Sequence, residues 1–197
     1  AMLFSLFDRL SFGAAFCEPS GRFVLSNPAL DVIVEDRDGL MRIGDRLAPT
    51  AKADAEPMRT ALDAALGVSA APAPSVFTLR RRSGALPLLC WVAPLRSQDL
   101  GPLPLVLVLV LDPEEDDLLT AEGLRGFGLL SEAELSVCDY LVRGFETDQI
   151  ADQRDASPET VRSQVKAAAA KLACRSRLDL VRLALASRPP LKHHGAP

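Results

Sequence analysis

The chain has 197 residues, of which 48% are hydrophobic and 24% charged, and this composition excludes a mainly disordered protein. Its net charge of −4 would by itself argue against a nucleic-acid-binding protein. The charge is unevenly distributed, however, since residues 157–188 hold seven Lys and Arg against two Asp and Glu, whereas residues 129–156 hold two against seven. Because binding depends on the face that is presented, the basic segment keeps nucleic acid among the candidate partners.

The residues that usually build catalytic and metal sites are sparse and widely spaced. The four cysteines show no CxxC spacing, and both histidines, His193 and His194, stand in a Pro/Gly-containing tail. We therefore expect no zinc site and no disulfide framework. With no nucleophile–base pair and no glycine-rich phosphate loop in the sequence, we also expect no enzyme and no cofactor.

Nothing in the sequence predicts a membrane partner. The longest apolar run, residues 103–111, is about half the length that spans a bilayer and reads as a buried strand. The first ten residues lack the basic region and cleavage signature of a signal peptide. We therefore expect a cytoplasmic protein.

The first part of the chain is predicted to be mostly strands. The runs FGAAFCE and GRFVLSN flank PSG at residues 19–21, which predicts a hairpin. Ser26 or Asn27 before Pro28 predicts a helix start, and the amphipathic run ADAEPMRTALDAALG predicts a second helix that ends at Gly67. Three further strands are predicted in SVFTLRR, PLLCWVAPLR and LPLVLVLVLD. The expected fold is a small antiparallel sheet with short helices on one side.

This order of elements, over roughly residues 10–113, resembles a PAS-like sensor domain. The resemblance implies a curved sheet whose inner face can hold a ligand or a partner. The short cysteine motif of flavin-binding light sensors is missing, and so is a histidine that could ligate haem. Two interpretations stay open: a packed core that serves dimerisation or protein contact, and a small ligand whose identity is unknown.

Three local features of this part have a structural and a functional interpretation. Residues 80–82, Arg-Arg-Arg, adjoin a predicted turn, and we expect a solvated strand edge rather than an anion site. Trp91 stands in an apolar strand, which predicts a core residue. Asp36 and Asp38 follow a helical segment and not a buried parallel strand, so a phosphoacceptor site is not favoured.

A domain junction is predicted in the acidic and glycine-containing segment DPEEDDLLTAEGLRGFG, residues 112–128. We expect a first domain over residues 1–113, a linker over 114–128, a second domain over 129–190 and a tail over 191–197.

The second domain is predicted to be helical from its capping signals. SEAE at residues 131–134 is a capping box, and the helix that it starts is expected to stop at Gly144. ETDQIAD predicts a short helix that is capped by Glu146 or Thr147. The buried residues of these two helices are predicted to be Val137, Cys138, Leu141, Ile150 and Ala151.

A third helix is predicted to begin at Ser157, with Pro158 in its first position. One apolar stripe recurs with a helical period at Val161, Val165, Ala168 and Leu172. At 100° per residue, the roughly opposite face presents Arg162, Ser163 and Lys166. Two short helices joined by a tight turn, the second with a cationic face, predict a helix-turn-helix motif.

The sequence LLSEAELSVCDYLVRGFETDQIADQRDASPETVRSQVKAAAAKLACRSRLDLVRLAL, residues 129–185, resembles the DNA-binding domain of LuxR/FixJ-type (GerE-like) regulators. The resemblance implies that Arg162, Ser163 and Lys166 face base edges and that Thr160, Gln164, Lys171 and Arg175 lie near phosphates. Ser157, the cap of the third helix, completes the implied DNA-binding set. The last helix, residues 176–187, is implied to contribute a dimer contact through Leu178, Val181 and Leu185.

The sequence departs from the family pattern at a few positions. Asp148 stands where the family often has Lys, and Gln164 where it often has His, so phosphate contact by the second helix is not implied for this chain. Ala168 and Ala169 replace larger apolar residues, which predicts a less stable domain.

The predicted fold class is α+β, with a PAS-like antiparallel sheet followed by an all-α, four-helix LuxR-type domain. The leading hypothesis is a bacterial transcription regulator, a homodimer that reads a two-fold symmetric operator in double-stranded DNA under control of its first domain. The alternative is a protein-interaction module that binds a partner regulator or an RNA polymerase subunit. The net charge of residues 129–156 and Asp148 favour this alternative.

Overall fold

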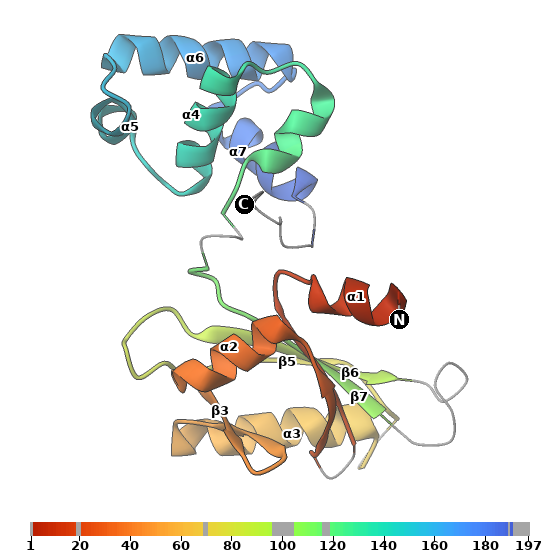
Figure 1. The fold of residues 1–197 in the computed structure, drawn as a ribbon. Helices are drawn as coiled ribbons and strands as arrows, with labels where there is room; N and C mark the ends of the chain where they lie inside the picture. The colour runs from red at the N-terminus through yellow and green to blue at the C-terminus, as the bar shows by residue number, and fades with distance from the viewer. Residues whose placement is uncertain are drawn as a thin grey trace. The chain divides into compact units, whose positions relative to one another are not determined.

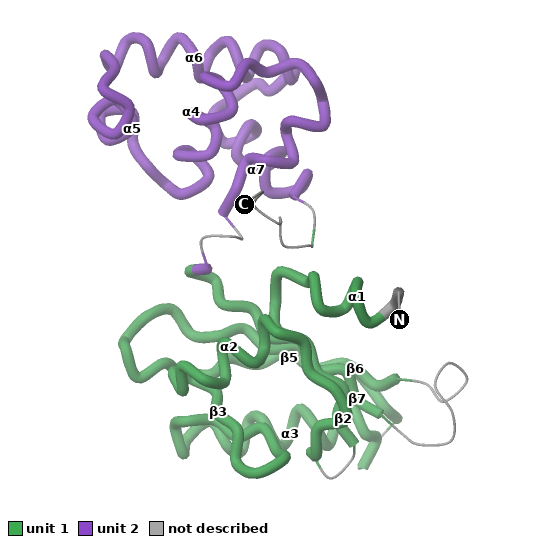
Figure 2. The backbone as a smooth tube through the Cα atoms, in the orientation of Figure 1, with its two compact units in different colours: residues 1–114, 190–197 green, residues 115–189 purple. Residues whose placement is uncertain are grey.

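The computed structural model describes residues 2–18, 21–68, 71–95, 105–115, 119–188 and 190. The chain divides into two compact units, residues 1–114 with 190–197 and residues 115–189 (Figures 1 and 2). Several predicted features lie wholly or partly outside the described residues: the tail at 191–197 with His193 and His194, residues 19–20 of the hairpin turn, 103–104 of the last apolar run and 116–118 of the linker.

The first unit is built on a five-stranded antiparallel sheet with the strand order β2-β1-β7-β6-β5. Its strands are β1 (Gly13–Cys17), β2 (Phe23–Ser26), β5 (Ser75–Leu79), β6 (Leu88–Leu95) and β7 (Leu105–Leu111). The predicted hairpin is confirmed, since β1 and β2 pair antiparallel. The Leu/Val run β7 is the central strand, paired with β1 and β6. The fold class predicted from the sequence is confirmed.

Short helices and a second hairpin lie between β2 and β5. These elements are α2 (Pro28–Asp36), β3 (Leu40–Ile43), β4 (Arg46–Pro49), the 3₁₀ turn η1 (Lys52–Asp54) and α3 (Ala55–Leu66). Asn27 is the residue that caps α2: its Oδ1 accepts hydrogen bonds from the backbone N–H of Leu30 at 3.0 Å and of Ala14 at 2.8 Å. The cap therefore also ties α2 to β1.

Buried and partly exposed residues alternate along the strands, so the core of this unit lies on one face of the sheet. Cys90 and Val92 of β6 and Val106, Val108 and Val110 of β7 are buried, and they pack in one cluster with residues of α2 and α3. Trp91 points to the opposite face and is 37% exposed. The prediction that Trp91 is a core residue is wrong. Neighbouring residues of a strand point to opposite faces of the sheet, and here Cys90 and Val92 take the core face.

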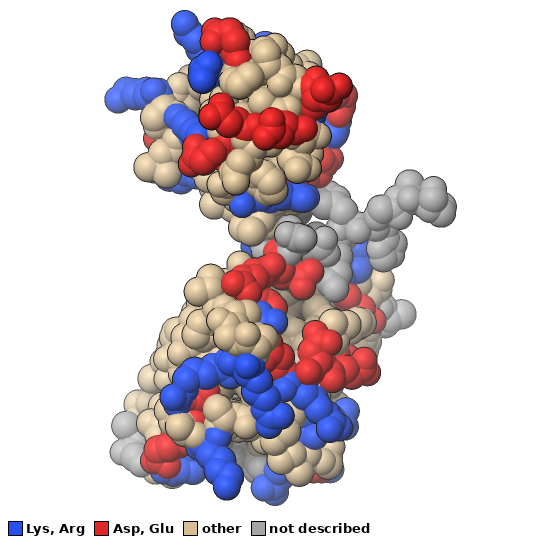
Figure 3. Space-filling model, turned by 90° about the vertical axis from the view of Figure 1, so that its left-hand side faces the viewer, with Lys and Arg blue, Asp and Glu red and all other residues tan. Residues whose placement is uncertain are grey.

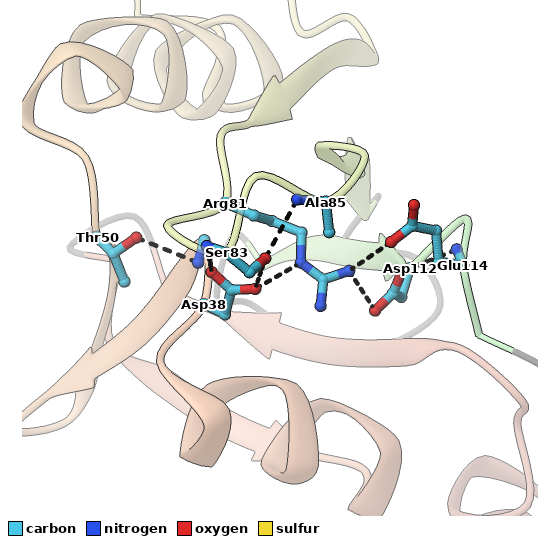
Figure 4. A network of polar contacts seen from close by, with 8 residues as sticks. Asp38, Thr50, Arg81, Ser83, Ala85, Asp112 and Glu114 are labelled. Atoms are coloured by element: carbon cyan, nitrogen blue, oxygen red, sulfur yellow. Dashed lines mark hydrogen bonds and ion pairs between the residues drawn. The ribbon is translucent and has the colours of Figure 1, made fainter.

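The prediction of a solvated edge at residues 80–82 is wrong for Arg81, whose side chain is only 15% exposed. Its guanidinium donates to Asp38 at 2.8 Å and to Asp112 at 2.7 Å (Figure 4). Hydrogen bonds from Ser83 and Arg81 hold the pKa of Asp38 well below its usual range. Arg81 thus joins the end of α2, the β5–β6 loop and the residue that follows β7.

The second unit is all helical. It contains the 3₁₀ turn η3 (Glu122–Phe127) and the helices α4 (Glu132–Val142), α5 (Thr147–Gln153), α6 (Pro158–Lys171) and α7 (Arg177–Ser187). Each contributes buried side chains to one core, among them Leu124, Val137, Ile150, Val161 and Leu180. Within the part of the chain that the structure describes, every helix is too short or too polar to cross a membrane.

Candidate nucleic-acid interface

The predicted capping box at the start of α4 is confirmed. The hydroxyl of Ser131 accepts a hydrogen bond from the backbone N–H of Glu134 at 3.3 Å, and the Glu134 carboxylate accepts from the backbone N–H of Ser131 at 2.7 Å. The same carboxylate accepts from the Lys171 ammonium at 2.8 Å, although Glu134 is buried. The capping box therefore ties the start of α4 to the end of α6.

The Glu134 carboxylate gives a testable dependence of stability on pH. Hydrogen bonds from Lys171 and Ser131 lower the pKa of Glu134 below its ordinary value. A pKa lowered by folding contributes stability above the pKa of the unfolded chain, about 4.3 for Glu, and the contribution is lost as the pH falls through the folded-state pKa. We expect Glu134→Gln to lower the free energy of unfolding at neutral pH by about 1–3 kcal/mol and to flatten its fall below about pH 4.5.

Urea unfolding of both proteins between neutral and acidic pH measures these two effects. The control is Glu159→Gln, which removes an equal charge from an exposed position on α6. An acid slope that Glu134→Gln leaves unchanged relative to this control would contradict the assignment.

Helix α5 is positioned by a cap and two buried side chains. Its cap is Glu146, whose backbone N–H donates to the Gln149 side chain at 2.8 Å. Ile150 and Ala151 are buried, as predicted. The chain then turns through Asp155, which adopts a left-handed conformation with φ 48°. This short turn joins the end of α5 to the start of α6.

The start and the buried face of α6 agree with the sequence prediction. The Ser157 hydroxyl accepts from the backbone N–H of Thr160 at 3.1 Å, and Pro158 occupies the first helical position. Of the predicted apolar stripe, Val161 and Ala168 are fully buried, and the other two members, Val165 and Leu172, pack against the same core. The orientation of α6 about its own axis is therefore fixed by the core.

That orientation exposes the three side chains that were predicted to face base edges, Arg162, Ser163 and Lys166. Arg162 pairs with Glu159 at 3.2 Å, and both side chains are largely exposed. Such a surface pair is worth about 0–1 kcal/mol, so it opens readily for another acceptor. Among the described residues, Lys166 has no ion-pair partner. These three positions on the exposed face of α6 thus present two cations and a hydroxyl.

The four residues that were predicted to lie near phosphates differ in whether their side chains have partners within the domain. Thr160 and Arg175 are exposed, whereas Gln164 and Lys171 contact other side chains of the domain. Gln164 is half-buried and accepts a hydrogen bond from the Arg154 guanidinium, which leaves its amide nitrogen as a donor. Lys171 is engaged by Glu134 within the domain. A DNA phosphate would therefore compete with Glu134 for this ammonium.

Arg154 is a residue of the interface that sequence reasoning did not single out. It caps the end of α5 and holds the side chain of Gln164 across the turn. The signal was its position as the first residue of the segment RDASPET that turns the chain, since a long basic side chain there can reach the first turns of the next helix.

The predicted dimer-contact residues lie on α7. Leu178 is 74% exposed and Leu185 is also exposed, whereas Val181 packs in part against the core of its own unit. The start of α7 is anchored by Arg177, which donates to the backbone carbonyl of Phe145 at 2.6 Å and pairs with Glu146 at 3.0 Å. The exposed side chains of Leu178 and Leu185 therefore lie on a helix whose first residue is bonded to the turn between α4 and α5.

Two short helices joined by a tight turn, the second with one face buried and the other cationic, define a helix-turn-helix domain. A model of the family "Bacterial regulatory proteins, luxR family" matches residues 128–184. This segment of the chain is a helix-turn-helix domain of the LuxR family, and it follows a domain built on a five-stranded antiparallel sheet. No curated protein matches the chain with significance.

Solved structures of similar layout include two of VqmA from Vibrio cholerae. The VqmA dimer without target DNA is 20% identical over 94% of this chain and 86% of that chain, with a TM-score of 0.39. The VqmA–ligand–DNA complex is 18% identical over 98% and 90%, with a TM-score of 0.40. A LOV protein of Rhodobacter sphaeroides is 15% identical over 93% and 90%, with a TM-score of 0.37. At these values the likeness assigns no residue role to this chain.

Proposed function

We propose that the chain is a transcriptional regulator, and not an enzyme, whose helix α6 enters the major groove of double-stranded DNA. The observation that carries this proposal is the division of α6 into two faces. Val161 and Ala168 are buried in the domain, while Arg162 and Lys166 project into solvent. Base edges in the major groove present acceptors that Arg and Lys side chains match, and the groove is wide enough for a helix.

The start of α6 supports contact with the DNA backbone. Backbone N–H groups at a helix N-terminus and the helix dipole favour a phosphate. Ser157 and Thr160 add hydroxyl groups there, with 2.9 Å between their oxygens. In this proposal, Gln164, Lys171 and Arg175 supply further phosphate contacts along the helix and beyond its end.

The active form in this proposal is a homodimer located in the cytoplasm. A two-fold symmetric pair of helix-turn-helix domains reads half-sites about one helical turn of DNA apart, roughly 34–36 Å. Leu178, Val181 and Leu185 of α7 contribute to the contact between DNA-binding domains. Residues 1–113 act as the controlling domain and 129–190 as the DNA-binding domain. Of the linker predicted over 114–128, the part that forms η3 packs in the core of the helical unit and so belongs to the DNA-binding domain.

Selection from random duplex DNA, followed by sequencing, tests the proposal with the full-length protein. We expect an enriched, approximately palindromic motif, with binding that weakens steeply as salt is raised because phosphate contacts release counterions. Enrichment of no motif at low or at moderate salt would contradict sequence-specific DNA binding.

A second candidate function is a protein-interaction module whose partner is a basic surface of another regulator or of RNA polymerase. It is favoured by the acidic side chains that gather on the face of the helical unit seen in Figure 3. Glu146, Asp148 and Glu159 are exposed on or beside α5 and α6. The two candidates differ in whether Arg162 and Lys166 are required for binding.

A further inference from the structure

One face of the first unit carries an excess of exposed positive charge, although the chain as a whole is acidic. It is formed by the end of α2, the β3–β4 hairpin, the turn η1 and the β5–β6 loop. Residues 36–54 and 80–82 of these segments hold seven Lys and Arg against four Asp and Glu. The exposed cations are Arg37, Arg42, Arg46, Lys52, Arg80 and Arg82. We call this surface the basic face, and Figure 3 shows Lys and Arg side chains gathered on one side of the first unit.

Hydrogen bonds hold the segments of the basic face together. The hydroxyl of Thr50, which follows β4, accepts from the backbone N–H of Gly39 at 3.1 Å. The carbonyl of Thr50 accepts from the Arg82 guanidinium at 3.4 Å. In the same loop, the Ser83 hydroxyl donates to the Asp38 carboxylate at 2.6 Å. The hairpin, the end of α2 and the β5–β6 loop therefore form one continuous surface.

Two of the four carboxylates lie below this surface, where arginines already match their charge. Asp54 is buried and accepts from the Arg80 guanidinium at 2.7 Å, yet the Arg80 side chain is still 62% exposed. Asp38 is 18% exposed and pairs with Arg81 at 2.8 Å. The other two carboxylates, Asp36 and Asp45, are exposed. Six cations thus face solvent with two carboxylates among them.

The linker to the helical unit starts beside the basic face. Arg81, in the β5–β6 loop, donates to Asp112 at 2.7 Å, and Asp112 is the residue that follows β7 (Figure 4). Residues 113–121 then lead to η3 of the helical unit, and a segment of this length spans at most about 35 Å. A duplex held by the helical unit is therefore present to the basic face at an effective concentration on the order of millimolar.

We propose that the basic face contacts phosphates of the DNA that flanks the operator. The proposal rests on the proposed function, since α6 must first place the chain on its operator. Five of the six cations are arginines, whose guanidinium groups bind phosphate oxygens through paired hydrogen bonds. Non-specific contacts have dissociation constants of roughly 10⁻⁴–10⁻⁶ M, so they form at a millimolar effective concentration. They add affinity without changing the sequence that is read.

An acidic protein is the other partner that the charge of this face suits. A protein interface also needs an apolar centre. The exposed large apolar side chains in these segments are Ile43 of β3 and Leu86 of the β5–β6 loop. They come from different segments and are outnumbered by the cations. A protein would also have to arrive from solution, whereas the helical unit of the same chain supplies the duplex. DNA is therefore the favoured partner.

The test measures the affinity of the full-length protein for two duplexes that share the selected operator. The short duplex ends at the operator. The long duplex adds about 15 base pairs on each side, which exceeds the reach of the linker at about 3.4 Å per base pair.

The variant is Lys52→Gln/Arg82→Gln, which keeps Arg80 because that residue pairs with a buried carboxylate. The control is Arg9→Gln/Arg59→Gln, which removes the same charge from exposed positions outside the basic face. Arg9 follows α1 (Met2–Asp8), and Arg59 lies on α3. Circular dichroism and thermal melting of both proteins verify that the fold is intact.

We expect Lys52→Gln/Arg82→Gln to bind the long duplex at least about tenfold more weakly than the control in about 0.1 M salt, because each phosphate contact contributes up to about eightfold there. The salt dependence should become less steep by about one unit of slope for each contact that is lost. On the short duplex the variant and the control should bind alike.

Equal affinities of the variant and the control for the long duplex would overturn the proposal and leave an acidic protein as the partner of the basic face. An equal loss on both duplexes would also overturn it, since the contact would then not lie in the flanks. Failure of the proposed function looks different, because the wild type would then select no operator. In that case a long duplex of arbitrary sequence is used at low salt: weaker binding by Lys52→Gln/Arg82→Gln than by the control supports the basic face, and equal binding overturns it.

Discussion

Replacing Gly123 with alanine should destabilise the helical unit by about 1–3 kcal/mol, the usual cost of overpacking. A Cβ atom on Gly123 would overlap the backbone carbonyl of Ser187, at the end of α7, and would lie 3.0 Å from the nitrogen of Arg188. Because both are main-chain atoms, a side-chain rotation cannot relieve the overlap. Either η3 or the end of α7 must move, and both pack on the same core.

Gly126→Ala provides a matched control in the same 3₁₀ turn. No atom lies within 4 Å of a Cβ placed on Gly126, so this substitution should be neutral or stabilise the unit by up to about 1 kcal/mol. The two variants differ only in which side of η3 receives the methyl group.

The full-length protein allows the two units to be followed separately. Trp91 fluorescence reports the first unit, and far-UV circular dichroism is dominated by the helices of the second. For a unit of this size, a loss of 1 kcal/mol lowers the melting temperature by about 4–8 °C. We expect the dichroism transition of Gly123→Ala to fall and the fluorescence transition to stay in place. Equal melting of Gly123→Ala and Gly126→Ala would contradict the close approach of η3 to α7.

The sequence predicted those elements whose signals are local. The capping box at Ser131 and Glu134, the cap and proline that start α6, and the stripe from Val161 to Leu172 each depend on residues within a few turns of one helix. Where the buried residues of a helix recur with the helical period, they can be predicted from the sequence alone. The exposed cationic face of α6 then follows from the stripe by helical geometry.

The features that the sequence did not reveal depend on contacts between distant segments. The Glu134–Lys171 pair joins residues 37 positions apart, and Arg81 reaches Asp38 and Asp112 across 43 and 31 positions. The strands β3 and β4 are four residues each, too short to show an alternating pattern. Trp91 was misplaced because an uninterrupted apolar run does not say which alternate residues face the core.

Two alanines in the middle of α6 have a structural role. Ala168 is fully buried in the core that α4, α5 and α7 share, and Ala167 lines a groove between α6 and the start of α4. Small side chains there allow α6 to lie close to α4, which brings Lys171 within hydrogen-bonding distance of Glu134. The alanines of α6 bury less apolar volume than larger residues would, and the same close packing allows the Lys171–Glu134 ion pair between α6 and α4.

Arg162→Ala/Lys166→Ala should abolish specific DNA binding in the proposed regulator. Removing a base contact costs about 1–3 kcal/mol, and a homodimer makes both contacts twice, so affinity for the selected operator should fall at least about 1,000-fold, toward the non-specific level. The substitution of Arg162 also leaves Glu159 without its partner at the DNA surface. The dependence of affinity on salt should become less steep, by up to about one unit of slope for each phosphate that is no longer neutralised.

Fluorescence anisotropy with the selected operator measures these effects at several salt concentrations, and Arg182→Ala is the control. Arg182 is an exposed cation on α7, outside the helix-turn-helix, so its removal should change affinity only through the long-range field, which salt screens. Neither α6 side chain is part of the core, so circular dichroism and melting should remain those of the wild type. An affinity within about threefold of the control, a difference of less than 1 kcal/mol, would mean that α6 does not read DNA. That result would favour the acidic surface of the helical unit as the binding face and a protein as the partner.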